Sequence, residues 1–504
     1  MRRLTDLPFV VVLMGFGAVA MYVPAVHAFT QSDYEIARAF FYSGSLFFML
    51  AILIGMATAA NRPGPQARNQ LLTLVATFTL LPLMLAVPFA ESVPDTNFLS
   101  AWWEMISSLT TTGATLFEPE RLSPSVHLWR ALVGWLGGFF ILVTAVAVLA
   151  PMNLGGFEVL SGATAGQGAV IGGPVARGSV PSGRISRHAR ILFPVYAALT
   201  LLLWVGLILA GDPPLVAASH AMSTLATSGI SPIGGLNAAP SGVGGEVIII
   251  PFFAFALSRQ LYPAGRTIRR SESLSYDPEL RMAILFATIV PALLFLRHWV
   301  GALEVDEIAD TAAAMRALWG TTFTVLSFLS TTGFESADWS EARSWSGLTT
   351  PGLILAGLAV MGGGVATTAG GVKLLRVYAL YRHGEREVER LVHPNSIGGS
   401  GSQARRLRRQ GAQMAWIFFM LFALSIAVTM LALALTGLDF EGSTTFAVAA
   451  LSTTGPLATV ATEVPLSWAD LDTAARGITA AAMILGRLET LAIIALLNPD
   501  FWRG

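Results

Sequence analysis

The sequence predicts an all-α polytopic membrane protein, in which four similar units surround a central pore and a two-helix unit precedes them. Composition is the first observation behind this prediction. Hydrophobic residues make up 54% of the 504 residues, charged residues make up 12%, and mean hydropathy is +0.64. Soluble domains average about 25% charged residues, so a chain that crosses a bilayer many times is the better interpretation.

The second observation is a seven-residue phrase that occurs four times, about 100 to 120 residues apart. That spacing is too long for a solenoid and suits two membrane helices with a hairpin between them. The copies read Ser-Ser-Leu-Thr-Thr-Thr-Gly (107–113), Ser-Thr-Leu-Ala-Thr-Ser-Gly (223–229), Ser-Phe-Leu-Ser-Thr-Thr-Gly (327–333) and Ala-Ala-Leu-Ser-Thr-Thr-Gly (449–455).

The third observation is the alternation of charge between loops. Cytoplasmic loops of membrane proteins are enriched in Arg and Lys, and here basic and acidic loops alternate along the chain. This predicts that both termini are cytoplasmic. The basic loops contain Arg62, Arg68, Arg177, Arg184, Arg187, Arg190, Arg259, Arg266, Arg269, Arg270, Arg382, Arg386, Arg390, Arg405, Arg406, Arg408 and Arg409. The acidic loops contain Asp33, Glu35, Glu118, Glu120, Glu304, Asp306, Glu307, Asp310, Glu335 and Asp338.

The initial unit, residues 1–60, contains the apolar runs 7–26 and 39–58 and lacks the phrase. Each run holds about 20 residues, which is enough to cross a bilayer. Because two arginines precede the first run and Val26-His27-Ala28 ends it, a cleavable signal peptide is an alternative interpretation.

Each of the four pore units combines a long apolar run, a short apolar segment that ends at the phrase, and a second long run. The units are 61–155 (runs 71–90, 98–109 and 127–151), 156–270 (190–210, 214–225 and 243–264), 271–383 (279–300, 314–329 and 348–382) and 411–504 (412–436, 440–451 and 473–497). Residues 384–410 form an arginine-rich cytoplasmic linker, which is expected to be a docking or flexible segment.

The short segments are predicted to be re-entrant half-helices, because about 10 to 14 residues cannot cross a bilayer. Extended backbone must follow each of them. Irregular backbone at membrane depth is tolerated only where protein buries it or where it lines a water-filled cavity. Four such segments therefore predict a hydrated pore.

The phrase has the chemistry of a cation filter. A cation that leaves water exchanges its hydration oxygens for protein oxygens, and backbone carbonyls with nearby hydroxyls supply them. Thr and Ser precede each glycine, and glycine can turn the chain so that successive carbonyls point inward. The alternative is ordinary Ser/Thr-Gly turn chemistry after a helix, which four copies in equivalent positions make less favourable.

Two further features bear on gating. Five glycines interrupt the long run of the third unit between Met361 and Lys373, where an uninterrupted helix would be destabilised, so an intramembrane loop is expected there. Arg487 falls within the last run, where a charge costs at least about 2.5 kcal/mol unless it faces a cavity or a partner. Glu489 lies two residues away and does not share its helix face. Glu104, in the first short segment, is expected to be a structural hydrogen-bond partner rather than an ion ligand.

With these motifs the whole chain resembles the Trk/Ktr/HKT superfamily of potassium transporters, and its initial helix pair resembles the TrkH/TrkI branch. The resemblance implies K⁺ as the transported ion, coordinated by carbonyls of the phrase residues. The fourth phrase continues into proline and departs from an Asn-containing version in some members, which bears on selectivity for K⁺ over Na⁺. The implied filter residues are Thr111, Thr112, Gly113, Thr227, Ser228, Gly229, Thr331, Thr332, Gly333, Thr453, Thr454 and Gly455.

The resemblance also implies how the pore is gated and what regulates it. The glycine-rich break resembles the family's gate loop, and Gly486-Arg-Leu-Glu resembles a family motif whose arginine projects into the pore. For Lys373 a cytoplasmic anchor, and for Arg487 snorkelling or packing against another subunit, remain alternatives. A homodimer is implied, with a TrkA-like cytosolic ring that binds the nucleotide. The implied gate residues are Gly362, Gly363, Gly364, Gly370, Gly371, Lys373 and Arg487.

Other functions are less well supported. A Na⁺- or H⁺-coupled symporter, or a less selective K⁺/Na⁺ pathway, is the alternative within transport; proton coupling usually needs buried carboxylates or His, and all seven His were expected at span ends or in loops. An enzyme is not expected, because no metalloprotease or hydrolase motif appears. The chain has no cysteine, no nucleotide-binding motif and no charge excess that would indicate a nucleic-acid partner. No covalently bound cofactor is predicted.

Overall fold

The structure is a computed structural model that describes residues 9–58, 67–152, 154–157, 159, 181–263, 277–302, 311–346, 352–393 and 410–489. Within these residues every regular element is helical. Eight helical segments are long and apolar enough to cross a membrane, so the predicted all-α membrane fold is confirmed. They are Val10–Thr30, Tyr34–Thr58, Leu71–Ser92, Pro124–Leu149, Arg184–Leu209, Pro278–Arg297, Thr311–Leu329 and Gly411–Ala434.

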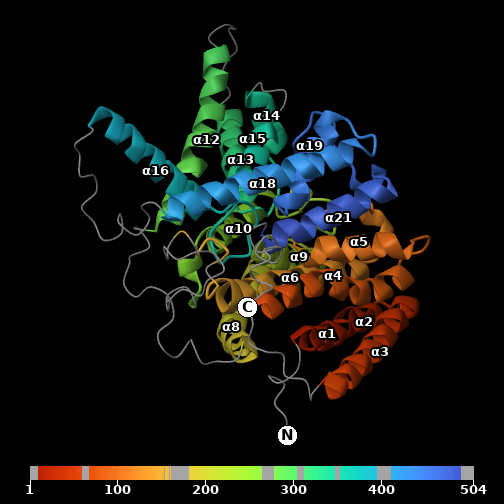
Figure 1. Ribbon diagram of the computed structural model, residues 1–504. Helices are drawn as coiled ribbons and strands as arrows, with labels where there is room; N and C mark the ends of the chain where they lie inside the picture. The colour runs from red at the N-terminus through yellow and green to blue at the C-terminus, as the bar shows by residue number, and fades with distance from the viewer. Residues whose placement is uncertain are drawn as a thin grey trace.

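The initial unit forms an edge of the molecule. Helices α1 (Phe9–Ala20), α2 (Tyr22–Thr30) and α3 (Tyr34–Thr58) pack against one another, and α1 and α3 also contact α4 (Ala67–Ser92) (Figure 1). Helix α2 also contacts α6 (Pro124–Thr144), where His27 Nδ1 lies 2.8 Å from the Ser125 hydroxyl.

The four predicted pore units appear as four helical hairpins, each with a middle helix that ends at a phrase. In three of them the middle helix is short: α5 and α19 have 12 residues and α9 has 13. The third, α13, has 19 residues and is long enough to span, which differs from the expected half-helix. The hairpins are α4, α5 (Phe98–Leu109) and α6 (Pro124–Thr144); α8 (Pro181–Leu209), α9 (Pro214–Ala226) and α10 (Gly242–Leu257); α12 (Pro278–Ala302), α13 (Thr311–Leu329) and α15 (Gly352–Met361), with α14 (Trp339–Ser346) between the last two; and α18 (Gln410–Ala434), α19 (Phe440–Leu451) and α21 (Thr473–Leu488).

Local sequence explains where the short helices begin. Asn97 accepts a hydrogen bond from the backbone N–H of Ser100, and Asp439 does the same for Gly442, so α5 and α19 have side-chain caps. Pro214 occupies the first turn of α9, where a missing N–H costs nothing. The three short middle helices therefore have a defined start as well as a defined end.

Two long runs are shorter as helices than the hydropathy pattern suggested. Helix α10 has 16 residues and ends at Leu257, and α21 has 16 residues and ends at Leu488. The run 348–382 is broken, as its glycines predict: α15 ends at Met361 and α16 (Leu374–Val392) begins after the loop. Helix α16 continues into the segment expected to be a linker and projects from the body of the molecule (Figure 1).

Several expectations lie outside the described residues. They concern the ends of the chain (1–8 and 490–504), most of the linker (394–409), and the loop residues Arg62, Arg177, Arg266, Arg269, Arg270, Glu304, Asp306, Glu307 and Asp310.

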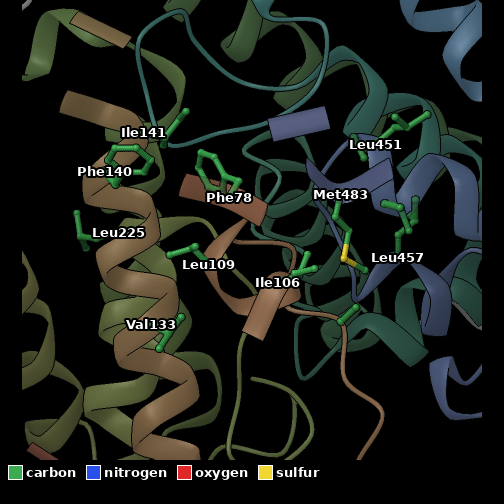
Figure 2. Packing of buried hydrophobic residues seen from close by; sticks show 14 of the residues in the cluster. Phe78, Ile106, Leu109, Val133, Phe140, Ile141, Leu225, Leu451, Leu457 and Met483 are labelled. Atoms are coloured by element: carbon green, nitrogen blue, oxygen red, sulfur yellow. The ribbon is translucent and has the colours of Figure 1, made fainter. Parts of the chain in front are cut away.

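The core lies behind the phrases. The leucine in the third position of each phrase is buried, with no more than 3% exposure for Leu109, Leu225, Leu329 and Leu451. Figure 2 shows Leu109 and Leu225 beside α6, the helix that carries Val133, Phe140 and Ile141. The leucine of each phrase thus packs its helix against the neighbouring helices. The polar residues of the phrase remain available to line the centre of the molecule.

Close approach at α6 depends on two adjacent glycines. A Cβ at Gly137 would lie 2.1 Å from the carbonyl oxygen of Leu109, and a Cβ at Gly138 would lie 2.8 Å from the Cα of Ala226. Helix α6 therefore packs against the ends of both α5 and α9, which brings the first two phrases together.

Candidate ion-conduction site

All four phrases end their helices with the same backbone turn. The fifth residue is left-handed in each, with φ of 55° at Thr111, 54° at Thr227, 58° at Thr331 and 54° at Thr453. The N–H of the sixth residue donates to the carbonyl of the first, at 2.8, 2.9, 2.9 and 2.9 Å in chain order. The N–H of the fifth also donates to the carbonyl of the second, at 2.9, 3.3, 3.1 and 3.2 Å. These paired bonds define a Schellman motif.

The position of the first left-handed residue in each phrase differs from the prediction. Sequence reasoning assigned the turn to the glycine, but the first left-handed residue is a threonine two positions earlier. A β-branched residue rarely adopts this conformation, and such strain persists only where the surroundings enforce it, often at functional sites. Gly113, Gly229 and Gly333 are left-handed as well, with φ of 73°, 65° and 80°. Gly455 is absent from the left-handed residues of the described chain, and Pro456 and helix α20 (Leu457–Val460) follow it.

Contacts between the glycines and neighbouring phrases close a ring. A Cβ at Gly113 would lie 1.7 Å from the carbonyl oxygen of Ser228, and one at Gly229 would lie 2.5 Å from that of Thr332. A Cβ at Gly333 would lie 3.1 Å from the Pro456 side chain. Gly455 closes the circuit, because its N–H donates to the carbonyl of Thr112 at 2.6 Å. The order around the ring is therefore first, second, third, fourth and first again.

The ring is buried, and the protein supplies hydrogen-bond partners for only some of its hydroxyl groups. The Thr and Ser residues in the fifth and sixth positions of all four phrases are no more than 1% exposed. Within the described chain the hydroxyls of Thr111 and Thr453 are buried without a hydrogen-bond partner. Buried polar groups of this kind are costly unless something satisfies them, and a dehydrated cation would do so.

The fourth phrase departs from the other three in its hydrogen bonds. The carbonyl of Gly455 accepts from the Trp468 ring N–H at 3.1 Å. The carbonyl of Thr112, one of the expected ion ligands, accepts from Gly455. The backbone of the ring is thus pseudo-symmetric, but the four phrases differ in which carbonyl oxygens already accept a hydrogen bond.

The glycine-rich loop, residues 362–373, lies directly against the ring. The N–H of Gly370 donates to the Thr331 hydroxyl at 2.8 Å, and the Thr227 hydroxyl donates to the carbonyl of Thr368 at 2.9 Å. A Cβ at Gly370 would lie 2.2 Å from the carbonyl oxygen of Ser452. The loop therefore touches residues of the second, third and fourth phrases.

The remaining loop glycines fit the loop against helix α10 and against itself. Cβ atoms at Gly363 and Gly364 would each lie 2.5 Å from a carbonyl oxygen at the end of α10, those of Ala256 and Leu257 respectively. Gly362 packs against the carbonyl of Gly370. Side chains larger than hydrogen would thus move the loop away from the ring.

Arg487 reaches the same loop from α21. Its Nη1 donates to the carbonyl of Thr368 at 2.7 Å, so this carbonyl accepts from both Arg487 and Thr227. The side chain is 4% exposed, and its Nε and Nη2 have no hydrogen-bond partner in the described structure. A cavity beside it is lined by Ile141, Ala145, Leu149, Gly155, Ala366, Thr367, Ala369, Gly370, Gly371, Lys373, Gly486, Arg487 and Glu489.

The other buried cations near the loop are bonded to the protein. Lys373 Nζ donates to the carbonyl of Ala369 within the loop, and the side chain is 6% exposed. Arg376 pairs with Glu489 at 2.8 Å, donates to the Val372 carbonyl at 2.9 Å and stacks over the Phe418 ring at 3.5 Å. As expected, Arg487 and Glu489 do not form an ion pair with each other; the Arg376 partnership was not foreseen, because the two residues lie more than 100 positions apart.

Buried carboxylates and histidine lie close behind the ring. Glu104 pairs with Arg130 at 2.7 Å, both buried, which confirms its structural role. Sequence reasoning missed Glu246, which is 1% exposed. It placed His220 at a helix end or in a loop, yet His220 lies within α9, fully buried, with Nε2 2.9 Å from the Ser231 hydroxyl.

Two acidic residues follow the third phrase. Burial raises the pKa of Glu335, an effect partly opposed by the positive charge of Arg343. Burial, together with the charge of Glu341, raises the pKa of Asp338, and Arg316 opposes this. Both carboxyls therefore become neutral at a higher pH than ordinary surface carboxyls.

These features define a class: a helical membrane protein in which four helical hairpins bring polar, strained turns into one buried ring with a loop against it. Residues 37–500 match the family model for TrkH, described as a cation transport protein. The chain belongs to the TrkH family of cation transport proteins.

Relatives and a solved structure agree with this assignment. The chain is 30% identical over 513 residues to the Trk system potassium uptake protein TrkH of Salmonella typhimurium, with 100% of this chain and 99% of the relative covered. It is 29% identical over 437 residues to the Trk system potassium uptake protein TrkI of Halomonas elongata, covering 85% and 82%. It superposes on the crystal structure of the potassium transporter TrkH from Vibrio parahaemolyticus with a TM-score of 0.79 and 26% identity over 100% of both chains.

Proposed function

We propose that this protein is the permeation subunit of a potassium-uptake system in the inner membrane. The observation that carries the proposal is the ring of four equivalent left-handed turns, whose unpartnered hydroxyls and neighbouring carbonyls suit a dehydrated cation. The relatives named as potassium uptake proteins support K⁺ as the ion. The ion would contact the twelve residues of the phrases that the sequence pattern indicated.

The driving force would be the membrane potential. About 2.3 kcal/mol per charge is available for every 100 mV. The basic loops support a topology with both termini cytoplasmic. Glu335 and Asp338 would then lie on the side from which ions enter.

The glycine-rich loop and Arg487 would together form the gate. The loop is bonded to two of the four left-handed threonines, Thr227 and Thr331. Arg487 donates to the Thr368 carbonyl of the loop, which also accepts from Thr227. A guanidinium with two unpartnered donors is a poorly compensated positive charge and would oppose cations below the ring. Opening would require the loop to leave both threonines and the arginine.

A separate cytosolic subunit of the TrkA type would bind the nucleotide and move the gate. Helix α16 follows the gate loop directly and carries Arg382, Arg386 and Arg390, of which Arg382 and Arg390 are exposed. A partner that binds α16 would thus be mechanically connected to the loop. Two copies of the chain would form a homodimer.

Complementation of a bacterial strain deficient in potassium uptake, grown at low K⁺, tests the function. The wild-type chain should restore growth, and Gly113→Ser and Gly333→Ser should not, because both replace left-handed glycines of the ring. Normal growth with both variants would refute the filter assignment. Lack of growth with the wild-type chain, if it is present in the membrane and co-expressed with a TrkA-type subunit, would refute potassium uptake.

A coupled symporter is the second candidate function. One observation favours it: Glu279 is buried in α12 and accepts the N–H of Val365 in the gate loop at 2.7 Å. Protonation of such a carboxylate could be linked to loop movement. Reversal potentials in proteoliposomes decide between the two, because an uncoupled pathway follows the K⁺ gradient alone, whereas a symporter also responds to an imposed Na⁺ or H⁺ gradient.

A further inference from the structure

The residue nine positions before each ring glycine occupies one structural position in all four units. These residues are Glu104, His220, Thr324 and Phe446. All lie in the helix that ends at the phrase. Their chemistry differs completely, so each unit holds its strand in its own way.

In three units this residue bonds the departing strand. Glu104 accepts the N–H of Leu116 at 3.1 Å, and Thr324 accepts the N–H of Ser336 at 3.3 Å; each donor follows its glycine by three residues. His220 bonds the hydroxyl of Ser231, two residues after its glycine. In the fourth unit Phe446 packs on Trp468, with ring centroids 4.7 Å apart.

The third unit receives a buried carboxylate from its neighbour. The hydroxyl of Thr324 is a weak acceptor, but Glu246 of α10 accepts three further bonds, two from the segment after Gly333 and one from helix α13. The donors are the Ser336 hydroxyl at 2.8 Å, the Ala337 N–H at 2.6 Å and the Trp319 ring N–H at 2.7 Å. The first and third units, which are opposite in the ring, are therefore both held by a buried carboxylate.

We infer that Glu104 and Glu246 are positioning residues for ion selectivity. The extended residues of each phrase are fixed at one end by the Schellman turn of the helix and at the other end by the segment after the glycine. The carbonyls between these two anchors can match one ion size only if both anchors hold. A buried carboxylate resists displacement, because breaking its bonds leaves a charge without compensation. The inference rests on the proposed filter function.

The decisive variants weaken the anchor without touching the ring. Glu246→Gln replaces an acceptor oxygen with a donor, so at least one of the three bonds must be lost. Ser336→Ala removes a single hydroxyl and retains the carboxylate. Glu341→Gln is the matched control, since Glu341 pairs with Arg316 at 2.7 Å at a partly exposed site on α14.

The measurement is the Na⁺-to-K⁺ permeability ratio of purified protein in proteoliposomes, from reversal potentials. The expected rise is about tenfold for Glu246→Gln and about threefold for Ser336→Ala, because the first variant removes the charged acceptor itself and the second removes only one of its donors. Glu341→Gln should leave the ratio unchanged. Simple loss of folded protein lowers both fluxes equally and does not move the ratio.

An unchanged ratio in both Glu246→Gln and Ser336→Ala would overturn the inference. If Glu246→Gln cannot be purified, Ser336→Ala decides alone. Failure of the proposed function would look different, because the ring variants Gly113→Ser and Gly333→Ser would then also leave uptake and the ratio unchanged.

Discussion

The ring and the loop beneath it are built in opposite ways. Four separate hairpins each contribute one copy of the same turn to the ring, with φ of the fifth residue within 54–58° in every copy. The loop comes from the third unit alone. Of the four left-handed threonines in the described structure, it bonds the hydroxyls of Thr227 and Thr331 only. Repetition suits a site that must surround an ion. A single element suits the proposed gate, because fewer contacts need to break when it moves.

The same contrast appears between two of the buried arginines, Arg376 and Arg487. Arg376 is held by a carboxylate, a carbonyl and an aromatic ring, so its charge is compensated. Arg487 has a single described hydrogen bond, to the loop. Arg487 therefore has fewer hydrogen-bond partners than Arg376 to compensate its charge.

The largest expected effect tests how tightly the ring is closed. Gly113→Ala should abolish K⁺ uptake, with at least about a 100-fold loss, because the new Cβ would lie 1.7 Å from the carbonyl oxygen of Ser228. Gly333→Ala should lose less, since its Cβ would meet only the Pro456 side chain at 3.1 Å. Rb⁺ uptake into proteoliposomes measures both, and equal losses would contradict the ring geometry.

The next effect concerns the uncompensated arginine. Arg487→Ala should raise Rb⁺ flux without the regulatory subunit by about tenfold. A tenfold rise needs only about 1.4 kcal/mol of the roughly 4 kcal/mol by which a unit charge at 4 Å opposes a cation at an effective dielectric of about 20. Arg476→Ala, at the start of the same helix, is the control; Arg476 bonds Ser100 and the Ala469 carbonyl, away from the loop. Equal flux from wild type and Arg487→Ala would count against a barrier role.

A smaller effect distinguishes the threonines that hold the loop from those that do not. Thr227→Ala and Thr331→Ala each remove one hydrogen bond to the loop, worth about 1 kcal/mol, so each should raise the closed-state leak about fivefold. Thr111→Ala and Thr453→Ala, whose hydroxyls have no partner in the described chain, should not raise it. Single-channel open probability measures this difference. The same increase in open probability in all four variants would contradict a special role for Thr227 and Thr331.

The smallest effect is a pH dependence at the entrance. Burial raises the pKa of Glu335, so its negative charge is lost as pH falls through a value above the usual carboxyl range. Cation attraction is present above that pKa and disappears below it, and K⁺ influx should fall about twofold. Glu335→Gln should show the lower influx at all pH values. Wild-type influx that stays constant as pH falls would contradict the role of this carboxylate.

Much of the site could be predicted from sequence because its signals are local. Run length and hydropathy indicate membrane helices, and a glycine cluster breaks one of them whatever it packs against. The interruption after Met361 therefore follows from a short stretch of chain. The structural role of Glu104 was likewise foreseen, because a charge inside a membrane needs a partner.

Other features were decided only by the tertiary structure, because they join residues far apart in the chain. The left-handed threonines depend on a ring that enforces strain, so the turn was assigned to the glycines instead. The length of α13, the extension of α16, the Arg376–Glu489 pair and the three bonds to Glu246 leave no local pattern. The sequence by itself determined that a polar turn follows an apolar helix four times; the order of these turns in a ring, and which two of them hold the loop, arise from packing between units.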